Sequence, residues 1–165
     1  MKRFPILKSN RCILGQITEK DFPAFLEIIN DHLTQLYLSE LCSVIHCDED
    51  IRLILKSFDS YFQNDEGVIW GIRLDNVMIG FIALMDLSCN PTIFYAMHPC
   101  FRGRGYLKEC ALIVVSYFFE IYPCLFLQTE VHNRNMQSIS LLQSVGFNIT
   151  GNDRVKTYLR KIRYT

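Results

Sequence analysis

The sequence has no excess charge of either sign and no long apolar run. Its 17 basic residues balance 17 acidic ones, so no overall field would attract nucleic acid or an anionic membrane. No apolar stretch approaches the roughly 20 residues that a membrane-spanning helix needs. Residues 1–8 are interrupted by charge before a secretory signal could develop. We therefore expect a cytoplasmic protein without nucleic-acid or membrane partners, as a monomer or homodimer.

The sequence also has no Cys-x-x-Cys pair, although seven cysteines are many for 165 residues. The odd number argues against a disulfide framework, and reduced thiols serve as small hydrophobic side chains. Cys42, His46 and Cys47 have metal-ligand chemistry but lack a second pair at zinc-finger spacing. We expect reduced cysteines and no metal site.

No internal repeat, low-complexity tract or linker interrupts the chain, and its length suits one domain over residues 1–165. Apolar spacing predicts an α/β (α+β) protein: a mixed, largely antiparallel central sheet with helices on both faces. Strands are expected at 12–17, 68–74, 77–87, 92–97, 125–131, 147–150 and 155–162. Helices are expected from 22, at 48–63, at 110–122 and at 133–145, with a broken helix or loop at 30–47. The candidates for burial on the long helix are Leu112, Val115, Phe118 and Phe119.

A loop with two glycines and two arginines lies between the strand 92–97 and the long helix. Amides at a helix start lack intrahelical partners and lie at the positive end of the helix dipole. Gly103 and Gly105 let a ligand approach the backbone closely, and Arg102 and Arg104 add positive charge. The loop predicts a site for a phosphorylated ligand.

Two nucleotide-binding motifs do not fit this loop. A dinucleotide fingerprint needs a third glycine where Lys108 stands, and a P-loop needs Gly-Lys-Ser/Thr. Arg102-x-x-Gly105-x-Leu107 instead resembles the pyrophosphate-binding motif of the GNAT acyltransferase superfamily, Gln/Arg-x-x-Gly-x-Gly/Ala. It departs from that motif at Leu107, whose side chain must point away from the phosphates unless the loop sits differently.

A second block, Asn135-x-x-Ser138 followed by Gly146-Phe147, resembles the signature of the Rim-type ribosomal-protein N-terminal acetyltransferases. Together the two motifs imply the acyl-CoA N-acyltransferase (GNAT) fold with acetyl-CoA as cofactor. They also imply that the strand 92–97 splays from the strand 125–131 around the pantetheine arm. The implied cofactor-binding residues are Ala96, Met97, Arg102, Gly103, Arg104, Gly105, Tyr106, Leu107, Asn135 and Ser138.

The resemblance implies direct attack of an amine on the acetyl thioester, which needs a general base and stabilisation of an oxyanion. Glu130 stands where the Rim-type sequences carry a catalytic glutamate and would act through a water. His98 and His132 are alternatives, of which His98 is the better placed. A backbone N–H near Met97 or His98 would stabilise the oxyanion.

The acid for the departing thiolate is less defined. Many relatives carry a tyrosine where Leu142 stands, and leucine cannot donate a proton. Ser138 resembles the serine proposed for this role in Rim-type enzymes, and a positioned water is the alternative. Cys100, beside the loop, would allow a covalent route, but nothing in the sequence activates it.

These features predict an acetyl-CoA-dependent N-acetyltransferase acting on a primary amine, either a peptide or protein N-terminus or a small amine, by direct attack in a ternary complex. The acceptor would bind between segment 31–47 and the last two strands, near Tyr37, Glu40 and His46. One alternative is a non-catalytic acyl-CoA-binding or sensing module on the same fold, motivated by Leu107 and Leu142. A nucleotide-binding protein is a third hypothesis.

Overall fold

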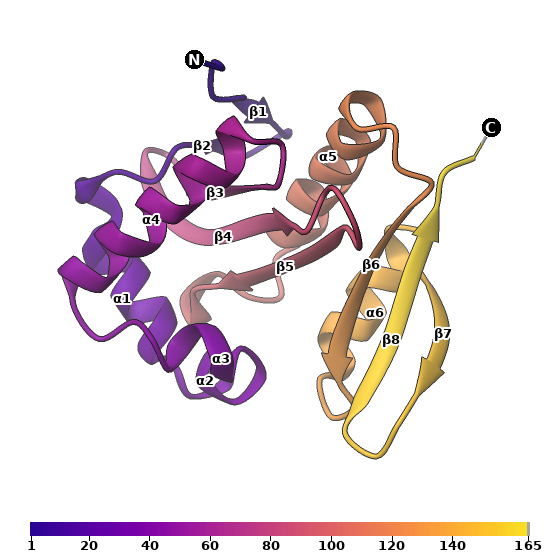
Figure 1. Cartoon of the computed structure of the whole chain (residues 1–165). Coiled ribbons are helices and arrows are strands. Elements are labelled where there is room, and N and C mark those ends of the chain that lie inside the picture. Colours follow the sequence, from indigo (N-terminus) through magenta and orange to yellow (C-terminus); the bar gives the residue numbers. More distant parts are fainter. Residues whose placement is uncertain (165) are drawn as a thin grey trace.

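A computed structural model describes residues 1–164 and contains one eight-stranded sheet with helices (Figure 1). The strands are β1 Leu7–Lys8, β2 Ile13–Gly15, β3 Gly67–Leu74, β4 Val77–Met85, β5 Thr92–Met97, β6 Phe126–His132, β7 Asn148–Asn152 and β8 Lys156–Ile162. The helices are α1 Phe22–Asn30, α2 His32–Tyr37, α3 Ser39–Cys42, α4 Asp48–Gln63, α5 Tyr106–Ile121 and α6 Met136–Ser144, with 3-10 turns at Glu19–Asp21 and Pro99–Phe101.

The sheet has the strand order β1-β2-β3-β4-β5-β6-β8-β7. Every neighbouring pair is antiparallel except β5 and β6, which are parallel. Asp75 and Asn76 form the turn between β3 and β4 with φ values of 48° and 65°, the left-handed conformation that suits tight hairpins. The expected mixed, largely antiparallel sheet is confirmed.

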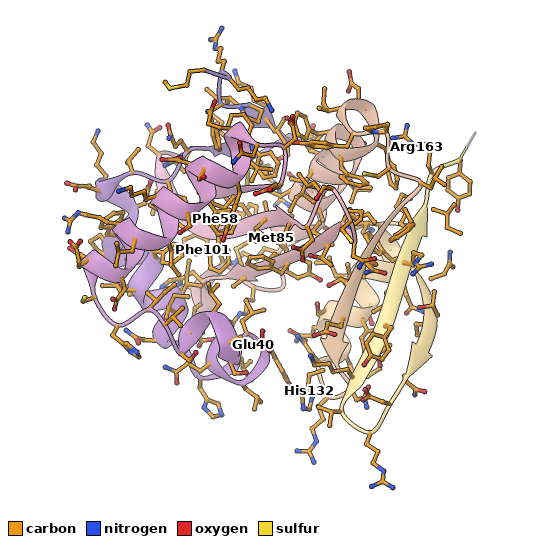
Figure 2. All side chains as sticks on the ribbon, in the orientation of Figure 1. Glu40, Phe58, Met85, Phe101, His132 and Arg163 are labelled. Atoms are coloured by element: carbon orange, nitrogen blue, oxygen red, sulfur yellow. The ribbon has the colours of Figure 1, made fainter. Side chains whose placement is uncertain are left out.

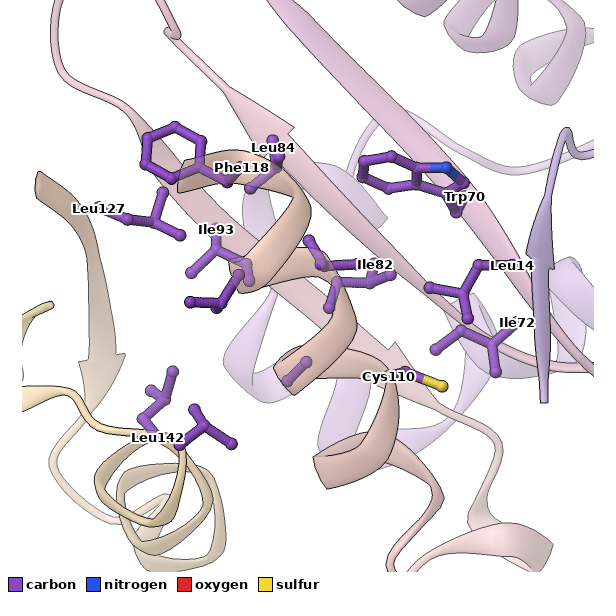
Figure 3. Close-up of a cluster of buried hydrophobic side chains, with 14 of the residues drawn as sticks. Leu14, Trp70, Ile72, Ile82, Leu84, Ile93, Cys110, Phe118, Leu127 and Leu142 are labelled. Carbon is purple, nitrogen blue, oxygen red and sulfur yellow. The ribbon is translucent and has the colours of Figure 1, made fainter. Parts of the chain in front are cut away.

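Helices cover both faces of the sheet, as predicted (Figure 1). Side chains alternate along a strand, so Ile69 of β3 packs toward α1 and α4, whereas Trp70 packs toward α5. Figure 3 shows the cluster on the α5 side of the sheet, where Phe118 lies beside Leu84 and Ile93, and Cys110 lies beside Ile72.

The structure corrects the sequence prediction at two places, β1 and Leu112, and decides between the two alternatives given for segment 30–47. β1 was not predicted, because a two-residue strand leaves no periodic signal. Segment 30–47 is a broken helix, formed by α2 and α3. Leu112 was expected to be buried, and this is wrong: it is 44% exposed, because the buried face of α5 runs through Cys110, Ala111, Val114, Val115 and Phe118.

β5 and β6 diverge soon after they meet. Their ladder holds one residue pair, Thr92 with Gln128, and Thr129 Oγ1 adds a hydrogen bond to Ile93 O at 2.8 Å. β4 pairs with β5 from Thr92 to Met97, so β5 continues while β6 turns away. The implied splay is present. Within residues 1–164, no helix has both the length and the apolarity that a bilayer crossing requires.

Candidate functional site

A cavity of about 790 Å³ opens where β5 and β6 diverge. Its walls come from the end of β5, the start of α5, the end of β6, the first turns of α6 and the α2 helix. Ten residues of the two sequence motifs and the adjoining strands line it: Ala96, Met97, Arg102, Gly103, Gly105, Tyr106, Leu107, Glu130, Asn135 and Ser138. The folding of the chain therefore brings the two motifs to one site.

The start of α5 presents free backbone amides to this cavity. Gly103 and Gly105 have φ values of 73° and 82°, a conformation that favours glycine because it lacks a Cβ. Gly105 is the N-cap of α5, and no side chain caps the helix there. The first intrahelical bond is Glu109 N–H to Gly105 O at 3.2 Å, so the amides of residues 105–108 stay available to an anion.

Arg102 is engaged within the protein. Its Nη2 lies 2.5 Å from Asp31 Oδ2 and 3.2 Å from Thr34 Oγ1, and its Nε donates to Met97 O at 3.1 Å. Burial favours a higher pKa for Asp31, but the Arg102 guanidinium and the Thr34 amide outweigh it and hold the pKa below its usual value. Arg102 therefore ties the start of α2 to the end of β5, a role that the sequence did not reveal.

The other cations of the loop are distributed differently from the prediction. Arg104 is exposed and outside the cavity lining, with its guanidinium 5.9 Å from the Phe101 ring. Lys108, in the first turn of α5, does line the cavity, although nothing in the sequence indicated that it would contact a ligand. Leu107 packs partly against the core and also lines the cavity.

The backbone at the end of β5 presents one amide to the gap. His98 N–H donates to Ile79 O at 2.7 Å, so it is not available for an oxyanion. Hydrogen bonds alternate along an antiparallel ladder, so the Met97 amide points away from β4 and toward the splay. Of the two amides proposed from the sequence, the geometry supports Met97.

Glu130 lines the cavity and pairs with a lysine. Its carboxylate forms an ion pair with Lys156 Nζ on β8, and this hydrogen bond raises the pKa of Lys156. The Glu130 side chain is about half exposed, and exposed ion pairs contribute only about 0–1 kcal/mol. The pair can therefore open at little cost when an acceptor enters.

The two histidine candidates differ in position. His98 lies outside the cavity lining, its Nε2 is 2.8 Å from Glu27 Oε2, and its Nδ1 accepts from Cys100 N–H at 3.2 Å. His98 therefore lies outside the cavity in which we expected it to act, and both of its ring nitrogens have partners within the protein. His132 lines the cavity, 5.6 Å from the Tyr37 ring between centroids, and Figure 2 shows it at the end of β6.

Asn135 and Ser138 form the N-terminal turn of α6. Asn135 Oδ1 accepts from Ser138 N–H at 3.3 Å and caps the helix. Ser138 Oγ lies 2.6 Å from Tyr95 Oη, a contact from β5 to α6. Tyr95 was not predicted as a site residue, since nothing in the sequence relates two residues 43 positions apart. Leu142 is buried in the core, 1% exposed.

The acceptor side of the cavity agrees with the prediction only for Tyr37. Tyr37 lines the cavity, whereas Glu40 and His46 are exposed and outside its lining. His46 Nε2 lies 2.9 Å from Ser43 O. Over residues 1–164 no three potential metal-ligating side chains gather at one point, and all seven cysteines are unpaired.

Comparisons with known proteins agree with this architecture. The family model described as "Acetyltransferase (GNAT) domain" matches residues 11–148. The uncharacterized N-acetyltransferase YoaA of Bacillus subtilis (strain 168) is 32% identical over 154 residues, which cover 90% of this chain and 85% of that protein. An uncharacterized N-acetyltransferase derived from the SPbeta prophage, YokL, of the same organism is 28% identical over 84% of this chain and 76% of its own length.

Solved structures share the fold at low sequence identity. RimL, a ribosomal L7/L12 alpha-N-protein acetyltransferase in complex with coenzyme A, has a TM-score of 0.82 at 14% identity, covering 96% of this chain and 98% of that one. The microcin C7 self-immunity acetyltransferase MccE, in complex with acetyl-CoA and AMP, has a TM-score of 0.77 at 12% identity over 93% of each chain. The chain belongs to the GNAT family and is an acetyl-CoA-dependent N-acetyltransferase.

Proposed function

We propose that this enzyme acetylates the α-amino group of a peptide or protein, or a small amine, by direct attack in a ternary complex. One observation carries the proposal: a single cavity joins the amides at the start of α5 to the carboxylate of Glu130. A thioester and an amine can therefore meet without a covalent enzyme intermediate. Cys100, the candidate for such an intermediate, is exposed and outside the lining.

The residues present fit acetyl-CoA. A Cβ is absent at Gly103 and Gly105, where the backbone is left-handed, and the amides of residues 105–108 can hold a pyrophosphate by charge-assisted bonds of about 1.5–3 kcal/mol each. Met97 and Ala96 line the splay, where an extended amide-bearing arm can pair with β5. Acetyl-CoA supplies the activated acyl group, and the non-catalytic alternative is not favoured.

We assign Glu130 as the base that takes the ammonium proton through a water, with the Met97 amide at the oxyanion and Ser138 at the sulfur. The acceptor would enter past Tyr37 and His132, whose rings are 5.6 Å apart. An α-amino group has an ordinary pKa of about 8, against about 10.4 for a lysine side chain. A carboxylate acting through water therefore favours the α-amino group. The whole chain would act as one domain, since β7 and β8 complete the sheet.

The test compares three acceptors: a peptide with a free α-amino group and no lysine, an N-terminally blocked peptide with one lysine, and a small primary amine. Products are counted by mass spectrometry, because exposed Cys47, Cys89 and Cys100 would react with thiol reagents. We expect turnover at pH 7.5 on the free α-amino group or the small amine. Turnover confined to the lysine side chain, or absent on all three, would refute the proposed acceptor class.

A further inference from the structure

The hydroxyl groups of Tyr95 and Ser138 meet inside the cavity. Tyr95 projects from β5 to the face covered by α5 and α6, and its Oη lies 2.6 Å from Ser138 Oγ. Both residues line the cavity. The contact crosses from β5 to α6 just beyond the last paired position of β5 and β6, Thr92 with Gln128.

The direction of this hydrogen bond follows from acidity. A phenol, with an ordinary pKa of about 10, is a much stronger donor than an aliphatic alcohol. Burial raises the pKa of Tyr95, more than the hydrogen bond to Ser138 lowers it, so the phenol keeps its proton across the physiological range. Tyr95 is then a permanent donor, and Ser138 Oγ accepts. The proton of Ser138 is left free to point into the cavity.

We propose that Tyr95 is a positioning residue that orients the Ser138 hydroxyl toward the sulfur of the acyl donor. The proposal rests on the role assigned to Ser138 above. A hydroxyl that accepts from a phenol is also polarised by it, because chained hydrogen bonds strengthen one another. Leu142 on α6, where many relatives carry a tyrosine, is apolar and buried. In this chain the tyrosine hydroxyl at the site comes instead from Tyr95 on β5.

The step balances without transfer of the serine proton. The amine nitrogen forms a bond to the acetyl carbon, and the carbon–sulfur bond breaks with its electron pair left on sulfur. Ser138 donates a hydrogen bond to that sulfur. Full proton relay from Tyr95 is unfavourable, because a thiol has a pKa of about 8.5 and the phenol a higher one. The ammonium proton of the acceptor leaves through water and Glu130 before the attack, and the second nitrogen proton, lost as the amide forms, leaves to solvent through the same water. The thiolate takes a proton from solvent.

The test measures coenzyme A affinity by calorimetry at pH 7 and pH 9, without an acceptor. A donor aimed at sulfur stabilises the thiolate, so the affinity of the wild type should rise with pH, by up to about tenfold for each unit by which the bound thiol pKa is lowered. Desulfo-coenzyme A, which has no thiol, reports the background from the other titratable or charged groups that line the cavity, namely Tyr37, Arg102, Tyr106, Lys108, Glu130, His132 and Arg134.

Tyr95→Phe and Ser138→Ala should each lose most of the pH effect, and the double variant should lose no more than either. We also expect Tyr95→Phe to lower kcat by about tenfold, the size of one polarised hydrogen bond, with little change in KM for acetyl-CoA. Tyr117→Phe is the matched control: Tyr117 is also partly buried, but its ring packs on Trp70 at 5.6 Å, outside the cavity. Ser140→Ala controls for a serine of α6 that lines the same cavity.

A full pH effect in Tyr95→Phe, or none in the wild type, would overturn the inference, as would equal losses in the Tyr117→Phe control. Because no amine takes part in the binding measurement, its result does not depend on which acceptor class the enzyme uses. Failure of every acceptor together with an intact pH effect would refute the proposed acceptor and leave the pair of hydroxyls in place.

Discussion

Replacing Arg102 by glutamine distinguishes two possible roles of this residue, an ion pair that holds α2 against β5 and direct binding of the cofactor phosphates. In the structure its guanidinium contacts Asp31, Thr34 and Met97 O within the protein. The Arg102 and Asp31 side chains are 26% and 15% exposed, so their ion pair is intermediate in burial. Exposed ion pairs contribute about 0–1 kcal/mol to stability, and breaking a buried pair costs about 3–5 kcal/mol. We therefore expect Arg102→Gln to lower the free energy of unfolding by about 2 kcal/mol.

A loss of about 2 kcal/mol lowers the melting temperature of a chain of this size by roughly 4–8 °C. Asp31→Asn keeps the cap on α2 and removes the charge, so it should cost less, and the double variant should cost less than the sum of the two. Thermal unfolding of the four proteins gives this coupling energy, which for contacting residues is typically about 0.5–3 kcal/mol.

The ligand side of the experiment uses acetyl-CoA and acetyl-pantetheine, which lacks the pyrophosphate. If Arg102 acts by holding α2 against the end of β5, Arg102→Gln should weaken both ligands by a similar factor. Additive stability effects, together with a loss of affinity confined to acetyl-CoA, would show that Arg102 contacts the phosphates and would refute the reasoning from the ion pair.

Two further predictions concern the loop and the base. Gly105→Ala places a Cβ in a left-handed residue, which lowers stability by about 1–2 kcal/mol, and it should weaken acetyl-CoA binding by at least about tenfold because the loop amides are displaced. Gly146 is also left-handed, at φ 97°, but lies outside the cavity. Gly146→Ala should therefore lower the melting temperature without changing the affinity measured by calorimetry. Equal acetyl-CoA affinities in the two variants would contradict this. Glu130→Gln should reduce kcat more at pH 7 than at pH 9, because an amine of pKa about 8 is already neutral at pH 9. Glu120 is exposed on α5, and Glu120→Gln should match the wild type. If the ratio of wild-type to Glu130→Gln kcat is the same at both pH values, Glu130 is not the base.

Local signals in the sequence predicted much of the site. Gly103 and Gly105 are left-handed where the loop required it, and Asn135 caps α6 with Ser138 in its first turn. Such features depend on residues a few positions apart, and their physical basis is local backbone chemistry.

The errors and omissions involve partners far apart in the chain. His98 was preferred to His132 as the alternative base to Glu130, but its ring contacts Glu27 of α1, 71 positions away in the chain. Arg102 and Asp31 are separated by the same distance, and Tyr95 reaches Ser138 only because α6 packs beneath the splay. No periodicity encodes such contacts, since they arise from how the sheet brings separate elements together.

The single paired position between β5 and β6 has a consequence for folding stability. β6, β7, β8 and α6 are joined to the rest of the sheet by little backbone hydrogen bonding, and mainly by side-chain packing against α5. An acetyl-CoA molecule bound between β5 and β6 would contact both strands and so connect the two parts of the sheet. At a concentration 100 times its Kd, such a ligand stabilises the native state by about 2.7 kcal/mol. The supply of acetyl-CoA would thus set the enzyme's resistance to unfolding and proteolysis as well as its rate.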